Sequence, residues 1–468
     1  MMQMSALIRA KPEWHVKMND PDIVARWTRE AADQGMTEAQ IRYVLAELAY
    51  YAGLRDERTG IEVSGVDGVW QSDTLIDDEL RSRLREAVRV LEDVPDSERD
   101  WHPGSDGQVL DLVHPSLFCR VRDVSRPHTA SWSTPHWEDV EYALSSKFQW
   151  LPTDVEVGED GDAVFLSYVN NLHPVAHREL ESVLPILFAR MRPLFENVLT
   201  DLRHPRPVRI KTDSSAWYEG EPRGPWDPEI DYPDEAVEIW EDDMAEWLST
   251  RTPVIPDAPV TFIQPVPLDD AVDLRGRRLQ VIVKLAAIHL TPDKPEYAGG
   301  AWHVEGMMNE RIVSTGIYYW DSENITESRL GFRAAVDPPG SDRSNHDALR
   351  DIYGLEEDAA LNQVLGAAQT RAGRALAFPN ILQHRVAPFR LVNPSRPGYR
   401  KILVFFLVEP SVTITSTSDV PPQQPWSPTS TMTLEQAKEY REQLMQERKY
   451  LVDQHNGVYE REFSLCEH

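Results

Sequence analysis

Residues 299–306 read Gly-Gly-Ala-Trp-His-Val-Glu-Gly and follow an apolar, β-branched stretch over 279–290. That stretch predicts a strand, and the Gly-Gly pair predicts a turn after it. If residues 302–306 are extended as well, His303 and Glu305 point to the same face, with Cα atoms roughly 6.5–7 Å apart. An imidazole and a carboxylate placed side by side in this way can hold one cation.

A second histidine, His384, precedes a turn and a final long apolar strand over 401–408. With His303 and Glu305 it would complete a set of two imidazoles and one carboxylate, the facial triad of non-haem iron oxygenases. Such a set leaves positions open for a bidentate co-substrate and dioxygen, which a closed four-ligand site does not. We therefore predict metal ligands and catalytic residues at His303, Glu305 and His384. Because a His-x-Glu pair also arises by chance, a surface strand on which the two histidines never meet stays an alternative.

The final strand opens with a cation, Arg400. A guanidinium pairs with a carboxylate through two parallel hydrogen bonds, so Arg400 is predicted to bind the distal carboxylate of a co-substrate such as 2-oxoglutarate. A solvent-facing arginine at the start of a strand is the plain alternative. Arg396, Lys401 and Arg390 compete for the same role.

Composition restricts the partners. The 468 residues carry a net charge of -29, from 77 acidic and 48 basic residues. A chain this acidic repels phosphate backbones, so we expect no nucleic-acid partner and a small-molecule substrate, with a weak preference for a cationic one. We find no apolar run of about 18 residues and no secretory h-region, so we expect no membrane partner and a cytoplasmic location. The sequence does not indicate an oligomeric state.

Hydrophobic spacing divides the chain. Thr37 and Gln40 form a capping box that predicts a helix from 38 onward, and helical spacing also covers 77–91 and 173–203. Strands and turns dominate from 279, the pattern of an antiparallel sandwich or barrel. We expect, in order, a mainly helical region over 1–140, a helix and loop region packing on the core over 141–260, the core over 261–410, a Pro/Ser/Thr-rich linker over 411–432, and a C-terminal helix and tail over 433–468.

The order His303-x-Glu305, His384, Arg400 resembles the Fe(II)/2-oxoglutarate-dependent oxygenase superfamily. Further motifs are similar to a family of largely uncharacterised fungal and bacterial proteins that carries a domain-of-unknown-function label within that superfamily. These motifs lie at 109–117, 147–152, 167–174, 297–306, 318–327 and 396–401.

The resemblance implies an α+β fold whose core is a double-stranded β-helix of the jelly-roll or cupin type. It also implies Fe(II), 2-oxoglutarate and O2 as cofactors and co-substrates, with succinate and CO2 released. Hydroxylation is the expected outcome, because halogenases of the superfamily lack the carboxylate that Glu305 supplies; desaturation stays open. The implied substrate is a small molecule, such as an amino acid or a natural-product intermediate. Two alternatives stay open: a cupin-type metalloenzyme that does not use 2-oxoglutarate, and a non-catalytic binding protein on an oxygenase-like core.

Several polar residues close in sequence to the triad are candidates for substrate contacts. Each has a structural alternative: a cation on the outer face of a strand, a histidine satisfied within the fold, or a hydrogen-bonded turn. The candidates are Lys284, His289, Tyr318, Asp321 and Arg329.

Overall fold

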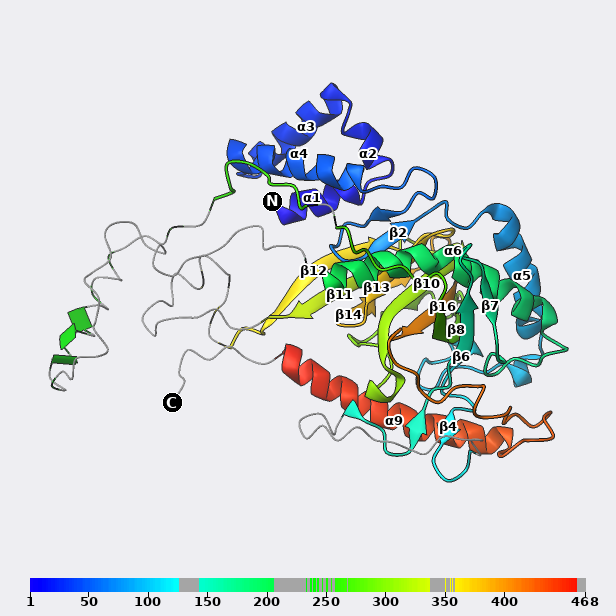
Figure 1. Ribbon diagram of the computed structural model, residues 1–468. Coiled ribbons are helices and arrows are strands. Elements are labelled where there is room, and N and C mark those ends of the chain that lie inside the picture. The colour runs from blue at the N-terminus through cyan, green and yellow to red at the C-terminus, as the bar shows by residue number, and fades with distance from the viewer. Residues whose placement is uncertain are drawn as a thin grey trace.

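A large antiparallel sheet is the main element of the computed structural model (Figure 1). The structure describes residues 1–125, 143–205, 257–266, 268–336 and 358–460, with single residues between 233 and 256 and between 350 and 356. Helices surround the sheet, so the chain has a mixed helix and sheet fold. The expected tail, 461–468, lies outside the described residues.

The nine-stranded sheet is built around four long central strands in the order β13, β10, β16, β8. Their bounds are β13 Ala375–Pro379, β10 Ile312–Glu323, β16 Gly398–Val408 and β8 Arg278–Leu290. Earlier segments extend both edges: β1 Glu62–Val63 and β2 Trp70–Ser72 beside β13, and β3 Val109–Val113, β6 Thr153–Val157 and β7 Ala163–Phe165 beside β8. The expected boundary at residue 261 therefore does not separate two sheets, because strands from both sides of it pair in one.

A second sheet has the order β12, β11, β14. Its strands are β12 Asn362–Gln369, β11 Arg329–Ala335 and β14 Gln383–Val386. Two further strand pairs lie in the described part of the chain: β9 Glu296–Tyr297 with β15 Phe389–Arg390, and β4 Arg120–Val121 with β5 Phe148–Gln149. Phe332 of the second sheet packs in one hydrophobic cluster with Phe378 and Phe406 of the large sheet. The two sheets thus share a core.

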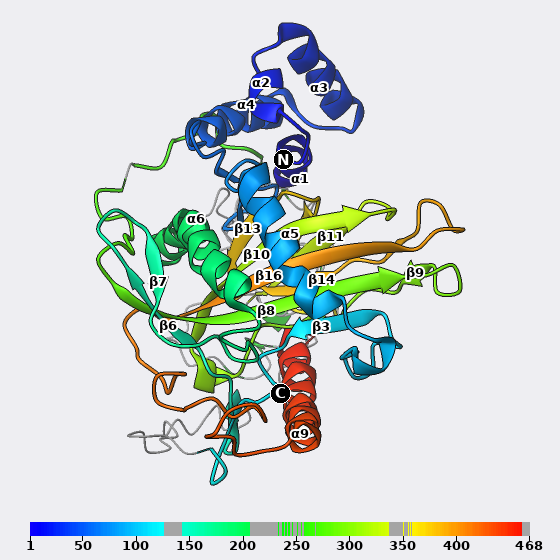
Figure 2. The same ribbon diagram turned by 90° about the vertical axis from the view of Figure 1, so that its right-hand side faces the viewer.

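Helices lie in each of the segments where caps or apolar spacing predicted them, and three further helices precede residue 38. Their bounds are α1 Met2–Arg9, α2 Trp14–Lys17, α3 Pro21–Asp33, α4 Glu38–Gly53, α5 Asp78–Glu92, α6 Arg178–Arg203 and α9 Leu434–Tyr459. Both hydrogen bonds of the capping box at Thr37 and Gln40 are present, which confirms that prediction. In both views α9 lies at the end of the molecule opposite to α1–α4 (Figures 1 and 2).

Alternate residues of β16 pack on opposite faces of the large sheet. Leu403 and Phe405 belong to the cluster that includes α5 and α6, and the ring of Phe405 lies 5.5 Å from that of Phe188 on α6. Val404 and Phe406 belong to the cluster that includes the second sheet and α9. We call the first the outer face and the second the inner face. Arg400 has the parity of the inner face.

Close contact between α6 and the outer face depends on a glycine in β10. A Cβ added at Gly316 would lie 2.4 Å from the ring of Phe195, which is fully buried. No side chain fits in that space, so any larger residue would push α6 away from the sheet.

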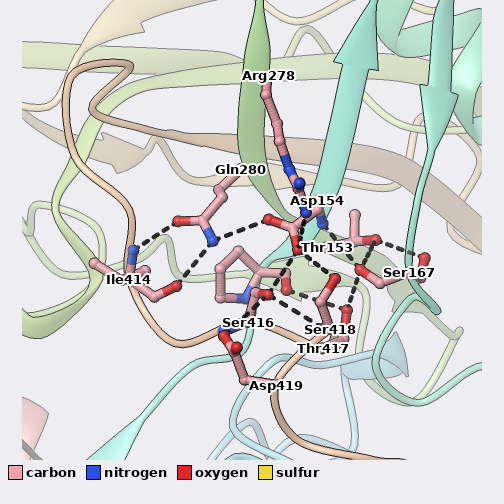
Figure 3. Close-up of polar contacts among 11 residues, drawn as sticks. Thr153, Asp154, Ser167, Arg278, Gln280, Ile414, Ser416, Thr417, Ser418 and Asp419 are labelled. Carbon is pink, nitrogen blue, oxygen red and sulfur yellow. Dashed lines mark hydrogen bonds and ion pairs between the residues drawn. The ribbon is translucent and has the colours of Figure 1, made fainter. Parts of the chain in front are cut away.

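Residues 411–432 form no helix or strand, but they are packed against the sheet rather than free. Figure 3 shows Ser416 and Ser418 pointing at Asp154 of β6; Ser416 Oγ donates to its carboxylate at 2.8 Å. The amide of Gln280 on β8 bonds both backbone groups of Ile414, each at 2.8 Å. The segment expected to be a linker thus supplies serines that bond a buried carboxylate of the sheet.

None of the helices in the described part of the chain has both the length and the apolar composition that crossing a membrane requires.

Candidate metal centre

His303 and His384 lie directly opposite each other. The N–H of His303 donates to the carbonyl of His384 at 3.1 Å, and the N–H of His384 donates to the carbonyl of His303 at 2.9 Å. His384 belongs to strand β14. His303 lies outside the named strands and pairs with His384 through this isolated bridge. The ring centroids are 4.4 Å apart. The alternative in which the two histidines never meet is therefore excluded.

Glu305 completes the cluster. Its Oε1 lies 3.3 Å from His384 Nε2 and 3.7 Å from His303 Nε2, and one ligand atom of each residue lies within 4.8 Å of the others. Atoms that share a cation at bonds of about 2.0–2.2 Å lie on the order of 3 Å apart when they are adjacent ligands. The three side chains are thus close to the spacing that one metal ion needs.

Hydrogen bonds orient two of these ligands. Ala301 O lies 2.9 Å from His303 Nδ1, so Nδ1 carries the proton and Nε2 keeps a lone pair toward Glu305. Asn380 Oδ1 accepts the backbone N–H of Glu305 at 2.9 Å, and Asn380 Nδ2 donates to the carbonyl of Glu305 at 2.9 Å. The backbone that carries the carboxylate is fixed on both sides by one side chain.

The three side chains of the cluster shift one another's pKa values. Burial alone would raise the pKa of Glu305, but the two histidines hold it well below its usual range. Burial lowers the pKa of His303, but hydrogen bonding and charge from Glu305 outweigh it and raise that pKa. Burial and the charge of His303 lower the pKa of His384. An ionised carboxylate beside His384, whose pKa is lowered, is a donor set that fits a divalent cation, because metal ligands must be deprotonated.

Arg400 lies in the core on the inner face. It is 2% exposed, and its Nη1 donates to Ser328 Oγ at 2.8 Å and Thr370 Oγ1 at 3.3 Å. Its guanidinium carbon lies 5.4 Å from the ring centroid of Tyr319 and 5.5 Å from that of Phe389. No carboxylate of the described residues lies within 4.0 Å of it. Burial lowers its pKa. A guanidinium that is buried without a counter-ion is costly, so this position favours an anion.

The three competing cations lie elsewhere. Arg396 is exposed and pairs with Glu323 at 2.9 Å. Lys401 has the parity of the outer face and pairs with Glu92 of α5 at 2.7 Å. Arg390 is exposed.

Of the five candidates for substrate contacts, Lys284 alone lies on the inner face with Arg400. It is paired in register with Val404, and it is partly buried. His289 is opposite Tyr399 in the register, so it has the parity of the outer face, where its ring lies 6.0 Å from that of Trp101.

The other three candidates are also placed away from the metal cluster's face. Tyr318 is fully buried in the outer-face cluster. Asp321 pairs with Arg85 of α5 at 2.7 Å. Arg329 is exposed and pairs with Glu327. We therefore assign neither these three residues nor His289 to the site.

A cavity of about 360 Å³ lies beside Glu305 and Asn380. Its apolar lining includes Met307, Met308 and Leu451 of α9. There is thus room next to the carboxylate ligand, with a largely apolar wall.

Three contributors to this region were not predicted from the sequence: Asn380, Ser328 and Thr370. A signal for Asn380 existed, because it occupies the turn between the strand ending at Pro379 and the one that carries His384. No local signal marks Ser328 or Thr370, which reach Arg400 only through the pairing of β11 with β12.

Comparisons with solved structures give weak matches. A structure described as an Fe(II)/(alpha)ketoglutarate-dependent dioxygenase, TqaL, matches at 8% identity over 70% of this chain and 75% of that chain, with a TM-score of 0.29. A dioxygenase for auxin oxidation from rice matches at 13% identity over 78% and 79%, with a TM-score of 0.25. Similarities this low carry no argument about fold or activity. No curated protein matches the chain.

Family comparison is decisive for membership. Residues 38–429 match the family described as "Protein of unknown function (DUF4246)", and residues 1–30 match the one described as "Domain of unknown function DUF4246, N-terminal". The match spans most of the chain and includes His303, Glu305, His384 and Arg400. The chain belongs to the DUF4246 family.

Proposed function

We propose that this chain is an Fe(II)/2-oxoglutarate-dependent oxygenase that hydroxylates a small molecule and releases succinate and CO2. The observation that carries the proposal is the pairing of two sites in one core: a cluster of two imidazoles and a carboxylate, and a buried guanidinium without a carboxylate partner among the described residues. The first fits a metal with open positions, and the second fits the far end of a dicarboxylate.

The strand order supports the core that the proposal needs, a double-stranded β-helix. Four antiparallel strands of the large sheet, β13, β10, β16 and β8, share a core with β12, β11 and β14. The bridge between His303 and His384 adds the segment before β10 to the edge of the second sheet. Apart from β11 and β12, which pair with each other, the consecutive strands of this set alternate between the two sheets, which supports a jelly roll.

Each residue has a defined part in the proposed reaction. His303 and His384 would hold iron(II) through Nε2, and Glu305 through its carboxylate. Ala301 and Asn380 fix the orientation of His303 and Glu305. Arg400 would bind the distal carboxylate of 2-oxoglutarate, helped by Ser328 and Thr370. When bound, iron(II) with 2-oxoglutarate and O2 supplies the oxidising chemistry.

The surroundings of the cluster serve to exclude water. Phe332 and Phe378 are fully buried, and the ring of Phe378 lies 4.7 Å from that of His384. The carboxylate at Glu305 favours hydroxylation over halogenation. If the protein were a cupin-type enzyme that does not use 2-oxoglutarate, no co-substrate carboxylate would pair with the buried Arg400. The burial of Arg400 therefore supports this alternative less. A cytoplasmic location stays part of the proposal.

The test is to load the protein with iron(II) and 2-oxoglutarate without oxygen, record the visible charge-transfer band, and then admit air and measure succinate. Wild type is expected to show the band and to form succinate, and His303→Ala is expected to show neither. His173→Ala is the matched control, because His173 lies outside the cluster. If the wild-type protein binds metal but 2-oxoglutarate has no effect, the result favours the cupin alternative. If the protein binds no metal, the proposal that it is an enzyme of this kind is refuted.

A further inference from the structure

Lys284 is a second cation on the inner face. It lies between the buried residues Val283 and Leu285 on β8, and it forms no ion pair within 4.0 Å in the part of the chain that the structure describes. Its charge acts on His303, whose pKa it lowers, and also on Asp111 and His114. The charge of Lys284 thus acts both on the metal cluster and on a second polar group.

Asp111 belongs to that second group. It lies on β3 opposite Ala286, two residues after Lys284 on the same face, so the two are diagonal neighbours with Cα atoms about 7–8 Å apart. The Asp111 side chain is 1% exposed. Its Oδ2 lies 2.8 Å from His102 Nδ1, whereas its Oδ1 is buried and has no hydrogen-bond partner among the described residues.

Asp111 is ionised. Burial raises its pKa, but the neighbouring His114 and the hydrogen bond from His102 outweigh burial and lower the pKa to about 2. Arg441 of α9 lies 3.7 Å from Oδ2, but its two amino groups point to Asp100 at 2.6 and 3.0 Å. One oxygen of a buried carboxylate is thus left without a donor, which costs free energy unless a ligand supplies one.

His102, Asp111 and His114 place ligand atoms within 4.8 Å of one another, but hydrogen bonding argues against a metal ion. Ser116 N–H donates to His114 Nδ1 at 3.2 Å, so the neutral ring of His114 carries its proton on Nε2. Neither nitrogen of the His114 ring then has a free lone pair with which to bind a metal ion. The group presents a carboxylate and an N–H donor.

We propose that Lys284 and Asp111 form a subsite for a zwitterionic headgroup, so that the primary substrate is an α-amino acid or a molecule with an equally close ammonium and carboxylate. The ammonium satisfies Asp111 Oδ1, and the carboxylate satisfies Lys284, with His114 Nε2–H as a second donor. Opposite charges that face one side of the sheet without pairing with each other fit a ligand that carries both signs. That the bound molecule is oxidised rests on the proposed function; that it binds does not.

The probes are the twenty proteinogenic L-amino acids, added singly to the full chain without metal or 2-oxoglutarate. A ligand that binds only the folded state raises the thermal midpoint, by an amount that grows with the ratio of its concentration to its Kd. At least one amino acid is expected to raise the wild-type midpoint. Lys284→Met and Asp111→Asn are each expected to weaken its binding on the order of tenfold or more, because each loses a charged hydrogen bond. Lys294→Met, which removes an exposed lysine paired with Asp106, is the control and is expected to bind normally.

Matched derivatives of the amino acid that binds test both ends of the subsite. Its decarboxylated amine is expected to lose the dependence on Lys284, and its N-acetyl derivative the dependence on Asp111. No stabilisation of wild type by any of the twenty, or equal binding by wild type and Lys284→Met, overturns the subsite. Weaker 2-oxoglutarate binding in Lys284→Met also overturns the subsite, because Lys284 would then be a residue that binds the co-substrate.

A failure to fold must be distinguished from a loss of binding, and a failure of the proposed function from a failure of the subsite. If Asp111→Asn fails to fold, Lys284→Met decides alone, because Lys284 contributes no ion pair to the described structure. If wild type binds an amino acid but forms no succinate when loaded with iron(II) and 2-oxoglutarate, the proposed function fails while the subsite stands.

Discussion

Arg400 Nη1 donates to Ser328 Oγ at 2.8 Å, which joins the start of β16 to the residue that precedes β11. Ser328 is 4% exposed, so the contact lies inside the core shared by the two sheets. A guanidinium stays charged at every pH that a protein tolerates, and a hydroxyl group does not neutralise it. Ser328 therefore orients Arg400 and leaves its charge for an anion.

Ser328→Ala is expected to weaken 2-oxoglutarate binding by about three- to tenfold, because it removes one hydrogen bond that orients Arg400. Titration calorimetry on the metal-loaded protein measures this. Ser395→Ala, an exposed serine in the loop before β16, serves as the control. Unchanged binding in Ser328→Ala would show that the hydroxyl has no part in anchoring.

Asn380→Ala is expected to weaken iron(II) or manganese(II) binding by about 10- to 100-fold, the range found when groups that orient a ligand are removed. The mutation frees both the N–H and the carbonyl of Glu305, so the carboxylate loses its fixed position. Metal titration gives the affinity, and urea unfolding is expected to show a loss of about 1–3 kcal/mol. Asn309→Ala, whose amide bonds Ser145 instead, is the control. Full metal affinity in Asn380→Ala would contradict the account.

One metal ion per chain is expected, although the described residues include two groups of two histidines and a carboxylate. Glu305→Gln is expected to abolish binding, whereas Asp111→Asn is expected to leave one ion bound, because His114 accepts at Nδ1 and cannot ligate. Metal analysis after dialysis measures the stoichiometry. Two ions per chain, falling to one in Asp111→Asn, would refute that interpretation.

Asp73 gives a pH-dependent contribution to stability. Burial raises its pKa, but hydrogen bonds and charge from Arg374 and Arg371 outweigh burial and lower it from 3.8 to about 2. A depressed carboxyl pKa stabilises the fold above the unfolded value, and the contribution is lost as pH falls from about 4 toward about 2. Asp73→Asn is expected to cost about 2 kcal/mol at pH 7 and progressively less below pH 4. Urea unfolding from pH 7 to pH 3 tests this, with exposed Asp96→Asn as control; a difference independent of pH would contradict it.

Local patterns predicted local structure. The capping box at Thr37 and Gln40 is bonded as expected, and the apolar run at 279–290 is β8. The i, i+2 spacing of His303 and Glu305 is a local feature, whereas their approach to His384 depends on an isolated bridge between distant segments. Bound iron and 2-oxoglutarate remain predictions.

Contacts between distant segments were not predictable in the same way. Tyr318 was expected near the substrate, but the register of β10 against β16 turns it to the outer face and its neighbour Tyr319 to Arg400. A shift of one residue reverses every side chain of a strand, and β10 also has an irregularity between Tyr319 and Asp321. The spacing of apolar residues predicts neither the register of β10 nor its irregularity. The packing of Ser416 on Asp154 depends equally on where β6 lies.

The measurement that tests the central claim most directly is 2-oxoglutarate binding by the metal-loaded protein without oxygen, comparing wild type, Arg400→Gln and Arg396→Gln. Arg396 is an exposed arginine four residues before Arg400 and is the matched control. The account predicts that Arg400→Gln weakens binding by tenfold or more, on the order of a lost charged hydrogen-bonding group, while metal affinity and the Arg396→Gln variant stay as in wild type. Equal 2-oxoglutarate binding by all three proteins, or none by wild type, would contradict it.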